Sequence, residues 1–505
     1  MTINVFNADC LDWLRQQPDN SIDSIVTDPP YGLSNTKPAQ VVDVLAAWVR
    51  GEDEAVPTKR GGFMGKDWDS FVPPPAVWEE CMRVLKPGGH MAVFAGARTQ
   101  DLMGLSIRLA GFEIRDTLGW IYGSGFPKSH DIGKAIDKRP GVHHHREFAA
   151  HLKERREAAG LSRQDVAERV VGTRSGACWN WEHHQFPKYE WWPALRDLLG
   201  LDEDRWGRIV AEADREVVGR AKGAQAESTG RYGAWGNDRG DGISEYNLTA
   251  PATSEAQRWD GWGTALKPAI EPIILARKPL DGTVANNVLA HGVGGLNIDA
   301  CRVQTTDKLG GGGATTPVSD GWDSPYRHRH EDIIRLKAET EKKVAKAESM
   351  GRFPANVLLD EHAAKEMDKQ SGALKTRGNK GESKATYTGG GATSFPSGAN
   401  YPFSYDAGGG ASRFFPVFKC QAKAPKKERP VIEREDGSKI QHPTVKPLTL
   451  LEWLVELITP PGGVVLDPFA GSGTTLQAAI NKGFTPIGIE QDADYIKLIN
   501  KRLGR

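Results

Sequence analysis

Two short segments near opposite ends of the chain each pass from an apolar run into a turn. Residues 21–28 carry isoleucine and valine and end in Asp28-Pro29-Pro30-Tyr31. Residues 463–475 run from Gly-Val-Val-Leu into Asp-Pro-Phe-Ala-Gly-Ser-Gly-Thr-Thr. Buried parallel strands deliver such turns at their carboxyl ends, where open α/β sheets bind ligands. The pattern predicts an α/β fold in which both ends of the chain build one sheet.

Further helix and strand signals flank both segments. Residues 78–85 have the spacing of an amphipathic helix, a Lys-Pro-Gly-Gly stop follows, and residues 90–94 favour a strand. The C-terminal region repeats this order, with helices expected over 448–457 and 474–481 and strands over 463–466 and 485–490. These are helix–strand units of a doubly wound sheet.

Composition limits the classes of partner. The 65 basic and 65 acidic residues cancel, so a nucleic acid must be bound by local patches rather than by a global positive field. The five cysteines are scattered and form no Cys-x-x-Cys pair, and His143-His144-His145 has no partner cluster, so we expect neither a disulfide framework nor a metal site. No signal-like start or apolar run of about 20 residues is present, which predicts a cytoplasmic protein without a membrane span.

The Asp28-Pro29-Pro30-Tyr31 tetrapeptide suits chemistry on an aromatic amine. The lone pair of such an amine is delocalised into its ring and must be localised before the nitrogen can attack. A carboxylate (Asp28) and a backbone carbonyl (Pro29) that each accept one N–H would achieve this and would stabilise the developing positive charge. Pro30 stiffens the loop, and Tyr31 can stack on a base that has left a duplex. The four residues are therefore predicted to be catalytic.

In this order, the two motifs resemble the β-class of amino-methylating DNA methyltransferases. The resemblance implies a Rossmann-like S-adenosylmethionine-dependent fold, built from both chain ends, with a loop-rich target-recognition region and a small all-α insertion. It also implies site-specific methylation of the exocyclic N6 of a flipped adenine in double-stranded DNA. Residues 259–269, Glu271-Pro272 and residues 352–357 resemble the phage and prophage members. A homodimer and a cognate restriction endonuclease are the other partners that the resemblance suggests.

The second motif is expected to hold the cofactor S-adenosylmethionine. Glycines allow the backbone to approach a ligand closely at a helix N-terminus. A dinucleotide site is disfavoured because the Rossmann fingerprint requires a third glycine where Leu476 stands. By resemblance, the segment around Asp9 meets the adenosine and the segment around Lys446 meets the methionine end. The predicted cofactor residues are Asp9, Cys10, Thr444, Lys446, Asp467, Phe469, Gly471, Ser472, Gly473 and Glu490.

Alternative functions remain open from the sequence. Cytosine-N4 methylation uses the same machinery, although aspartate in the first catalytic position resembles the adenine-N6 enzymes more. Cytosine-C5 methylation is disfavoured because it needs a cysteine that follows a proline, and no cysteine here does. A transcriptional regulator with an idle methylase scaffold and a nicotinamide-dependent oxidoreductase are the alternatives from other classes.

Four domains are expected along the chain. Residues 1–140 form the catalytic half, 141–218 a helical insertion, 219–440 the target-recognition and loop-rich region, and 441–505 the cofactor-binding half. The insertion resembles the helix-turn-helix of phage-repressor-like regulators, and a plain helical insertion is its alternative. Residues 331–350 favour a charged, solvated helix. Eight basic residues against four acidic ones between Lys419 and Lys446 suggest a phosphate-binding patch. The predicted DNA contacts are Arg352, Arg413, Lys423 and Lys426.

Overall fold

A computed structural model describes residues 3–505 except 35, 58–68, 124, 126–128, 138–144, 214–216, 223–244, 251–253, 306–338, 340–341, 347, 374–408, 419–423 and 425–427. The chain forms two compact units. The first comprises Met1–Gly125 and Ala269–Arg505, and the second comprises Phe126–Pro268. The limits of the four predicted domains remain a prediction, and most of the predicted charged helix over 331–350 lies outside the described residues.

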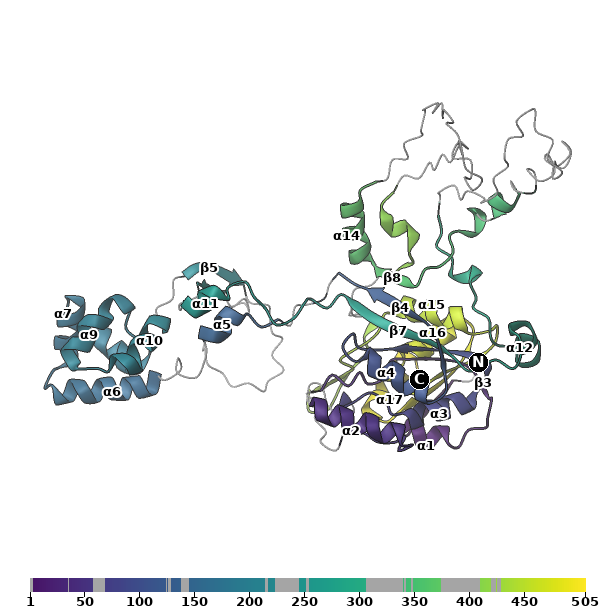
Figure 1. Ribbon diagram of the computed structural model, residues 1–505, viewed down its shortest axis with the longest axis horizontal. Helices are drawn as coiled ribbons and strands as arrows, with labels where there is room; N and C mark the ends of the chain where they lie inside the picture. The colour runs from purple at the N-terminus through teal and green to yellow at the C-terminus, as the bar shows by residue number, and fades with distance from the viewer. Residues whose placement is uncertain are drawn as a thin grey trace, which may run out of the picture. The chain divides into compact units, whose positions relative to one another are not determined.

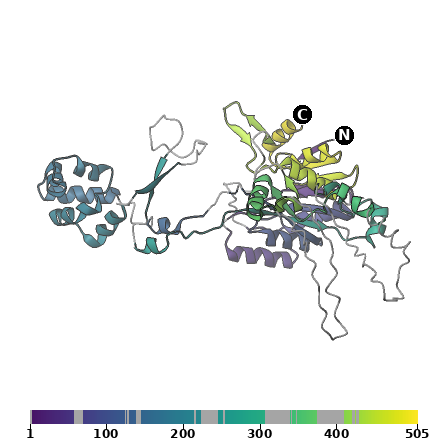
Figure 2. The same cartoon turned by 90° about the horizontal axis from the view of Figure 1, so that it is seen from above.

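A mixed sheet forms the centre of the first unit (Figure 1). In the described residues its order is β1-β13-β12-β2-β3-β7-β4-β8-β9. The strands are β1 (Asn4–Asn7), β2 (Ile22–Thr27), β3 (Leu85–Phe94), β4 (Glu113–Ile121), β7 (Ile270–Arg277), β8 (Val357–Asp360), β9 (Val417–Phe418), β12 (Val464–Asp467) and β13 (Thr485–Glu490). Neighbours pair in parallel except that β7 runs antiparallel to both β3 and β4. Figure 2 shows the purple N-terminal and yellow C-terminal segments within this one unit.

Two helical layers cover the sheet. Because side chains alternate along a strand, Ile25 of β2 packs into one core and Val26 into the other. The Ile25 core takes side chains from α1 (Cys10–Leu14), α2 (Pro38–Val49), α3 (Pro75–Val84) and α4 (Gln100–Leu109). The Val26 core takes side chains from α15 (Leu448–Ile458) and α16 (Thr474–Asn481). This arrangement confirms the predicted α/β fold built from both chain ends.

Smaller elements surround the sheet. The antiparallel pair β10 (Val431–Glu433) and β11 (Lys439–Gln441) packs on α17 (Ala493–Arg502) through Ile440, Tyr495 and Leu498. Two further helices are α12 (Val284–His291) and α14 (Glu361–Ser371). Among the described helices, none is both long enough and apolar enough to cross a membrane.

One local prediction is wrong. The Lys-Pro-Gly-Gly sequence at 86–89 does not separate helix from strand, because β3 already begins at Leu85. Leu85 pairs with Ile22, and the register then shifts before Ser24 pairs with His90. Gly88 adopts a φ of +76°, which few other residues tolerate. Gly88 and Gly89 therefore lie within an irregular strand and not in a turn.

The second unit contains a helical bundle with its own core. Its helices are α6 (His145–Ala158), α7 (Arg163–Val171), α8 (Ala177–His183), α9 (Trp192–Leu199) and α10 (Glu203–Ala213). Phe148, Trp181, Trp192 and Trp206 are almost fully buried between them. Ser162 accepts from the Asp165 amide and caps α7. The unit also holds α5 (Ile132–Asp137), α11 (Ser254–Arg258) and the pair β5 (Val217–Lys222) and β6 (Glu245–Thr249). The helix-turn-helix role of this bundle stays a prediction.

Candidate active site

The two sequence motifs lie side by side at the carboxyl ends of adjacent strands. Strand β2 leads into the Asp28 loop, β12 leads into the glycine loop, and Ile25 pairs with Leu466 between them. The hydroxyl of Thr27 donates a hydrogen bond of 2.7 Å to Oδ1 of the buried Asp467. The register of two parallel strands thus brings together residues more than 400 positions apart in the sequence.

Asp28 belongs to a cluster of four polar side chains. The Tyr31 hydroxyl donates to Asp28 Oδ1 over 2.8 Å. Lys446 Nζ lies 3.0 Å from Asp28 Oδ2 and donates to the Tyr31 hydroxyl over 2.8 Å. The same ammonium lies 3.3 Å from Oε2 of Glu271, on β7. Burial, reinforced by the charge of Asp28, raises the pKa of Tyr31 well above its ordinary value, so the phenol keeps its proton near neutral pH.

Two residues hold the Asp28 loop from outside it. Asp69 accepts the amides of Tyr31 and Gly32 over 2.8 and 3.0 Å, and Thr99 donates its hydroxyl to the Tyr31 carbonyl over 2.6 Å. Gly32 has a φ of +65°, and a Cβ there would lie 2.8 Å from the Val72 nitrogen. Burial raises the pKa of Asp69 above its usual range. Sequence reasoning missed Asp69 and Thr99 because neither lies in a motif.

The glycine loop turns sharply from β12 into α16. Gly471 and Gly473 have φ values of +53° and +78°, and a Cβ on either would come within 3.1 Å of a neighbouring side chain. Glu490, at the end of β13, accepts the amides of Gly471 and Asp492, each over 2.8 Å. Burial raises the pKa of Glu490 to about 7 and that of Asp467 to about 6. A glycine turn beside a carboxylate fits the hydroxyls of a nucleoside.

The remaining predicted cofactor residues have other contacts as well. Asp9 accepts the Leu11 and Asp12 amides and so caps α1. Next to it, burial raises the pKa of the Cys10 thiol to about 12. The Phe469 ring packs 6.3 Å from that of Trp78, and Ser472 accepts from Arg502 through its carbonyl and hydroxyl oxygens. The Thr444 carbonyl lies 2.8 Å from Nδ1 of His442. Lys446 is the residue whose surroundings differ most from the expected ones, because its ammonium lies within the Asp28 cluster.

The predicted DNA contacts are only partly described. The guanidinium groups of Arg352 and Arg413 lie 4.5 and 4.4 Å from the centre of the Phe414 ring. Arg413 also donates to the carbonyls of Gly409 and Gly410. Lys423 and Lys426 lie outside the described residues. The role of these four residues in DNA binding stays a prediction.

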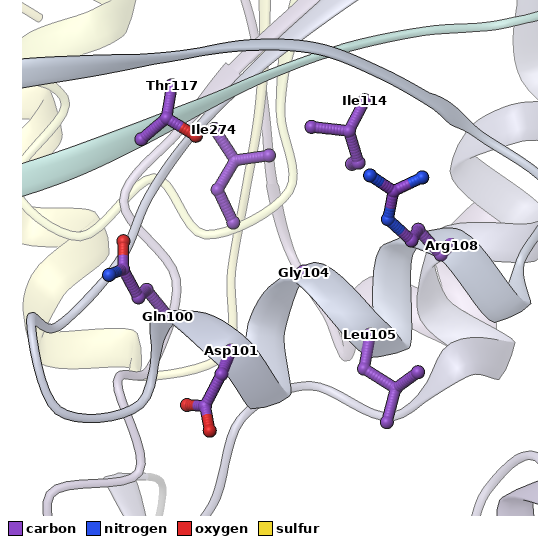
Figure 3. A pocket seen from close by; sticks show the side chains of 8 residues that line it. All are labelled: Gln100, Asp101, Gly104, Leu105, Arg108, Ile114, Thr117 and Ile274. Carbon is purple, nitrogen blue, oxygen red and sulfur yellow. The ribbon is translucent and has the colours of Figure 1, made fainter.

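A hollow of about 340 Å³ lies beside α4, β4 and β7 of the first unit (Figure 3). It is lined by Gln100, Asp101, Gly104, Leu105, Arg108, Ile114, Thr117 and Ile274. These residues belong to α4, β4 and β7, and the candidate site residues are not among them. Within the described part of the chain, no group of three His, Cys, Asp or Glu side chains is arranged to hold a metal ion.

The chain belongs to the DNA methylase family of N6/N4 methyltransferases, whose sequence model matches residues 22–174 and 265–501. Over 62 residues it is 50% identical to the putative methylase YubD of Escherichia coli K12, and over 62 residues it is 50% identical to the DNA adenine methyltransferase YhdJ of the same organism. Over 63 residues it is 46% identical to the type II methyltransferase M2.DpnII of Streptococcus pneumoniae. Each match covers 12% of this chain and 27%, 21% and 24% of the respective relative. The matched stretch therefore spans about a quarter of the length of these curated relatives.

Solved structures of other proteins align with the chain at low sequence identity. The chain aligns with TTHA0409, a putative DNA modification methylase from Thermus thermophilus, at 14% identity and a TM-score of 0.32, covering 100% of this chain and 95% of that one. It aligns with the complex of M1.HpyAVI and SAM at 12% identity and a TM-score of 0.32, covering 100% of both chains. For the cytosine-N4-specific PvuII DNA methyltransferase the values are 10% and 0.36, covering 99% of this chain and 86% of that one.

Proposed function

We propose that this protein is a site-specific DNA methyltransferase that transfers a methyl group from S-adenosylmethionine to the exocyclic N6 of a flipped adenine in double-stranded DNA. Membership of the DNA methylase family supports the reaction class. The adenine assignment draws on the relative YhdJ, a DNA adenine methyltransferase, and on aspartate as the first residue of the tetrapeptide. The single observation that carries the proposal is the Thr27–Asp467 hydrogen bond, which ties the Asp28 loop to the glycine loop.

The glycine loop and Glu490 fit the bound cofactor. The Glu490 carboxylate would accept hydrogen bonds from the ribose hydroxyls, and the backbone of residues 467–473 would approach the ligand closely because its glycines carry no side chain. Asp9, Cys10 and Thr444 are proposed to complete the site. When bound, S-adenosylmethionine supplies an electrophilic methyl group. The residues of this chain would bind and orient the target amine that accepts it.

Asp28 and the Pro29 carbonyl would each accept one N–H of the target amine. In the structure, Asp28 Oδ1 already accepts the Tyr31 hydroxyl. The target amine must therefore replace that hydroxyl, exchanging one hydrogen bond for another. The Tyr31 hydroxyl also accepts a hydrogen bond from Lys446, so its ring would turn onto the face of the flipped base once that bond is released as well. Stacking there would offset part of the unstacking cost of about a few kcal/mol. Asp69 and Thr99 fix the backbone around this exchange.

Double-stranded DNA would also be contacted away from the reacting base. We propose that Arg352 and Arg413 contribute to target recognition, and that the helical bundle of the second unit adds a helix-turn-helix contact. The chain is expected to act in the cytoplasm, where its substrate DNA lies.

Product analysis tests the proposed reaction. The protein is incubated with methyl-labelled S-adenosylmethionine and unmethylated genomic DNA, which is then digested to nucleosides. Labelled N6-methyldeoxyadenosine is the expected product. Labelled N4-methyldeoxycytidine would show that the target base is cytosine and not adenine. The absence of any labelled nucleoside across varied DNA would overturn the assignment as a DNA methyltransferase. Asp101→Asn, an exposed carboxylate on α4, is the matched control for substitutions at Asp28.

A further inference from the structure

Glu271 is a partly buried carboxylate, with 21% of its side chain exposed, that faces Asp28 from a different strand. It lies on β7, which pairs with β3 and β4, whereas Asp28 follows β2 and Lys446 precedes α15. Lys446 Nζ lies 3.0 Å from Asp28 and 3.3 Å from Glu271, and only 8% of the Lys446 side chain is exposed. The ammonium thus lies between two carboxylates contributed by separate parts of the fold.

Three oxygens surround the Lys446 ammonium. It donates a hydrogen bond to the Tyr31 hydroxyl, and oxygens of Asp28 and Glu271 lie within ion-pair distance of it. The rings of Tyr31 and Phe94 lie 5.1 and 4.9 Å from Nζ, which adds favourable cation–π contact. A lysine held on every side cannot leave easily to bind a distant ligand. This geometry favours a role toward Asp28 over a role toward the cofactor carboxylate.

The charges of the cluster add to one net negative charge when both carboxylates are ionised. The sign of this net charge matters for methyl transfer. The target nitrogen uses its lone pair to form the new C–N bond, the C–S bond breaks with its electron pair retained by sulfur, and the nitrogen stays cationic until one of its protons leaves to water. A buried site that is net negative stabilises this developing charge, because little solvent is present to screen it.

We infer that Lys446 and Glu271 are positioning residues for methyl transfer, in which Lys446 orients the Asp28 carboxylate and Glu271 balances Lys446 so that Asp28 keeps its negative charge toward the target amine. The inference rests on the proposed function. Without Glu271, the ammonium and Asp28 would neutralise each other, and the site would offer the cationic nitrogen no net charge. Without Lys446, the two carboxylates would face each other with no cation between them, and their repulsion would move Asp28 from this position.

The titration of the surrounding groups agrees with this arrangement. Burial alone would lower the pKa of Lys446, but Asp28 and Glu271 together raise it above its ordinary value, so the lysine stays charged. Burial raises the pKa of Glu271, Lys446 opposes that rise, and Asp28 adds to it. The phenol of Tyr122 also faces Glu271, and its pKa is raised to about 12 by burial and by the Glu271 charge. The substitution Glu271→Gln removes the Glu271 charge with little change in the shape of the side chain.

Glu271→Gln in the full-length protein tests the inference. Single-turnover methylation of unmethylated DNA should be about tenfold to a hundredfold slower than in the wild type, which is less than the ~10²–10³-fold loss expected for a group that touches the developing charge, because Glu271 acts through Lys446 and Asp28. The Kd for S-adenosylmethionine, measured by calorimetry, should not change, because Glu271 is proposed to act on Asp28. Glu271→Asp keeps the charge and should recover part of the lost rate. The matched control is Glu113→Gln, which removes a β4 carboxylate paired with Arg277 and should retain the wild-type rate.

The outcomes separate this inference from the proposed function. Methylation by the wild type combined with a wild-type rate in Glu271→Gln would overturn the inference alone. No methylation by the wild type on any DNA would overturn the proposed function and the inference with it. If Glu271→Gln does not fold, the double variant Glu271→Gln/Lys446→Gln removes both charges of the pair together. That variant keeps the net charge of the cluster but lacks the ammonium that orients Asp28, so it should be slower than the wild type, and a wild-type rate would overturn the inference.

Discussion

Thr27 and Asp467 join the two halves of the candidate site through a single buried hydrogen bond of 2.7 Å. Thr27 is the last residue of β2 and directly precedes Asp28, and Asp467 is the last residue of β12 and begins the glycine loop. Asp467 Oδ1 also accepts the Phe469 amide over 3.1 Å, so one oxygen orients both loops. Burial raises the pKa of this carboxyl group to about 6. This hydrogen bond therefore connects the position of the Asp28 loop with the ionisation of Asp467 in the glycine loop.

Thr27→Val removes this donor while keeping the shape of the side chain. The free energy of unfolding should fall by about 1–3 kcal/mol, because a buried carboxylate loses a partner. Binding of S-adenosylmethionine should also weaken, since the glycine loop loses one of its anchors; chemical denaturation and calorimetry measure the two effects. Ser24→Ala is the matched control on the same strand, because Ser24 bonds Thr459 over 2.7 Å. An equal loss of cofactor affinity in Ser24→Ala would show that the Thr27 effect is not specific.

Asp28→Asn removes the negative charge and replaces one carboxylate oxygen by an NH2 group, which cannot accept an N–H. Methylation should be slower by about 10²–10³-fold or more, as expected when a preorganised group that stabilises developing charge is lost. The Kd for S-adenosylmethionine should stay unchanged because the glycine loop is intact. Labelled methyl incorporation and calorimetry on the same preparation check both points. Methylation by this variant at the wild-type rate would show that Asp28 is not a catalytic residue.

The affinity for S-adenosylmethionine should depend on pH through Glu490. Burial raises the pKa of this carboxyl group to about 7, and the ionised form is the better acceptor for ribose hydroxyls. Affinity should therefore be full above pH 7 and fall as the pH drops below it, approaching about tenfold per pH unit. Glu490→Gln should bind more weakly and show a flatter profile in calorimetry. An unchanged slope in this variant would assign the titration to another group.

Stability of the unliganded protein should change with pH in the opposite direction. A carboxyl group whose pKa is raised by folding favours the folded state at low pH, and this contribution is lost as the pH rises through the raised value. For Glu490 the window runs from its ordinary 4.5 to about 7. Urea denaturation of the wild type and of Glu490→Gln across this range measures the contribution as their difference. A difference that does not vary between pH 5 and 8 would contradict it.

The sequence predicted those parts of the fold that local pattern encodes. Helix 474–481 and strand 485–490 were predicted with the bounds that the structure gives them, because a glycine turn precedes the helix and apolar residues fill the strand. The antiparallel strand β7 was not predicted, although its sequence is strongly apolar. A buried strand has the same pattern in either direction, and only its pairing with β3 and β4 fixes its orientation.

In the candidate site, too, the sequence predicts the residues that lie in local motifs and not the contacts between distant segments. Asp28 and the glycine loop stand in recognisable motifs, so they were identified from the sequence. Glu271 lies in a stretch that resembles the family, but a single glutamate at the start of a strand does not indicate that its side chain will contact Lys446. Asp69 does not lie in any recognisable motif, and its two hydrogen bonds to the Asp28 loop arise from tertiary packing. Contacts between distant segments are the information that a sequence pattern lacks.

The helical bundle of the second unit should depend on Glu182. Its side chain is 1% exposed, and its two oxygens accept from Arg156 and Arg163, each over 2.6 Å. Burial would raise the pKa of Glu182, but both arginines together lower it below its ordinary 4.5, so this stabilisation is present near neutral pH and is lost on acidification below about that value. Glu182→Gln should lower the free energy of unfolding of the bundle by about 3 kcal/mol at most, because Arg163 remains partly solvated.

Hydrogen exchange of the backbone amides of residues 145–213 in urea measures this effect in the bundle itself, because tryptophans buried in the first unit, such as Trp78 and Trp120, would also contribute to the fluorescence. The matched control is Glu157→Gln, because Glu157 pairs with the same Arg156 over 3.2 Å but its side chain is 56% exposed. An exposed pair of this kind contributes about 0–1 kcal/mol, so this variant should unfold close to the wild-type midpoint. Equal midpoints for the Glu182 and Glu157 variants would show that the buried Glu182 contacts do not stabilise the bundle more than the exposed pair does.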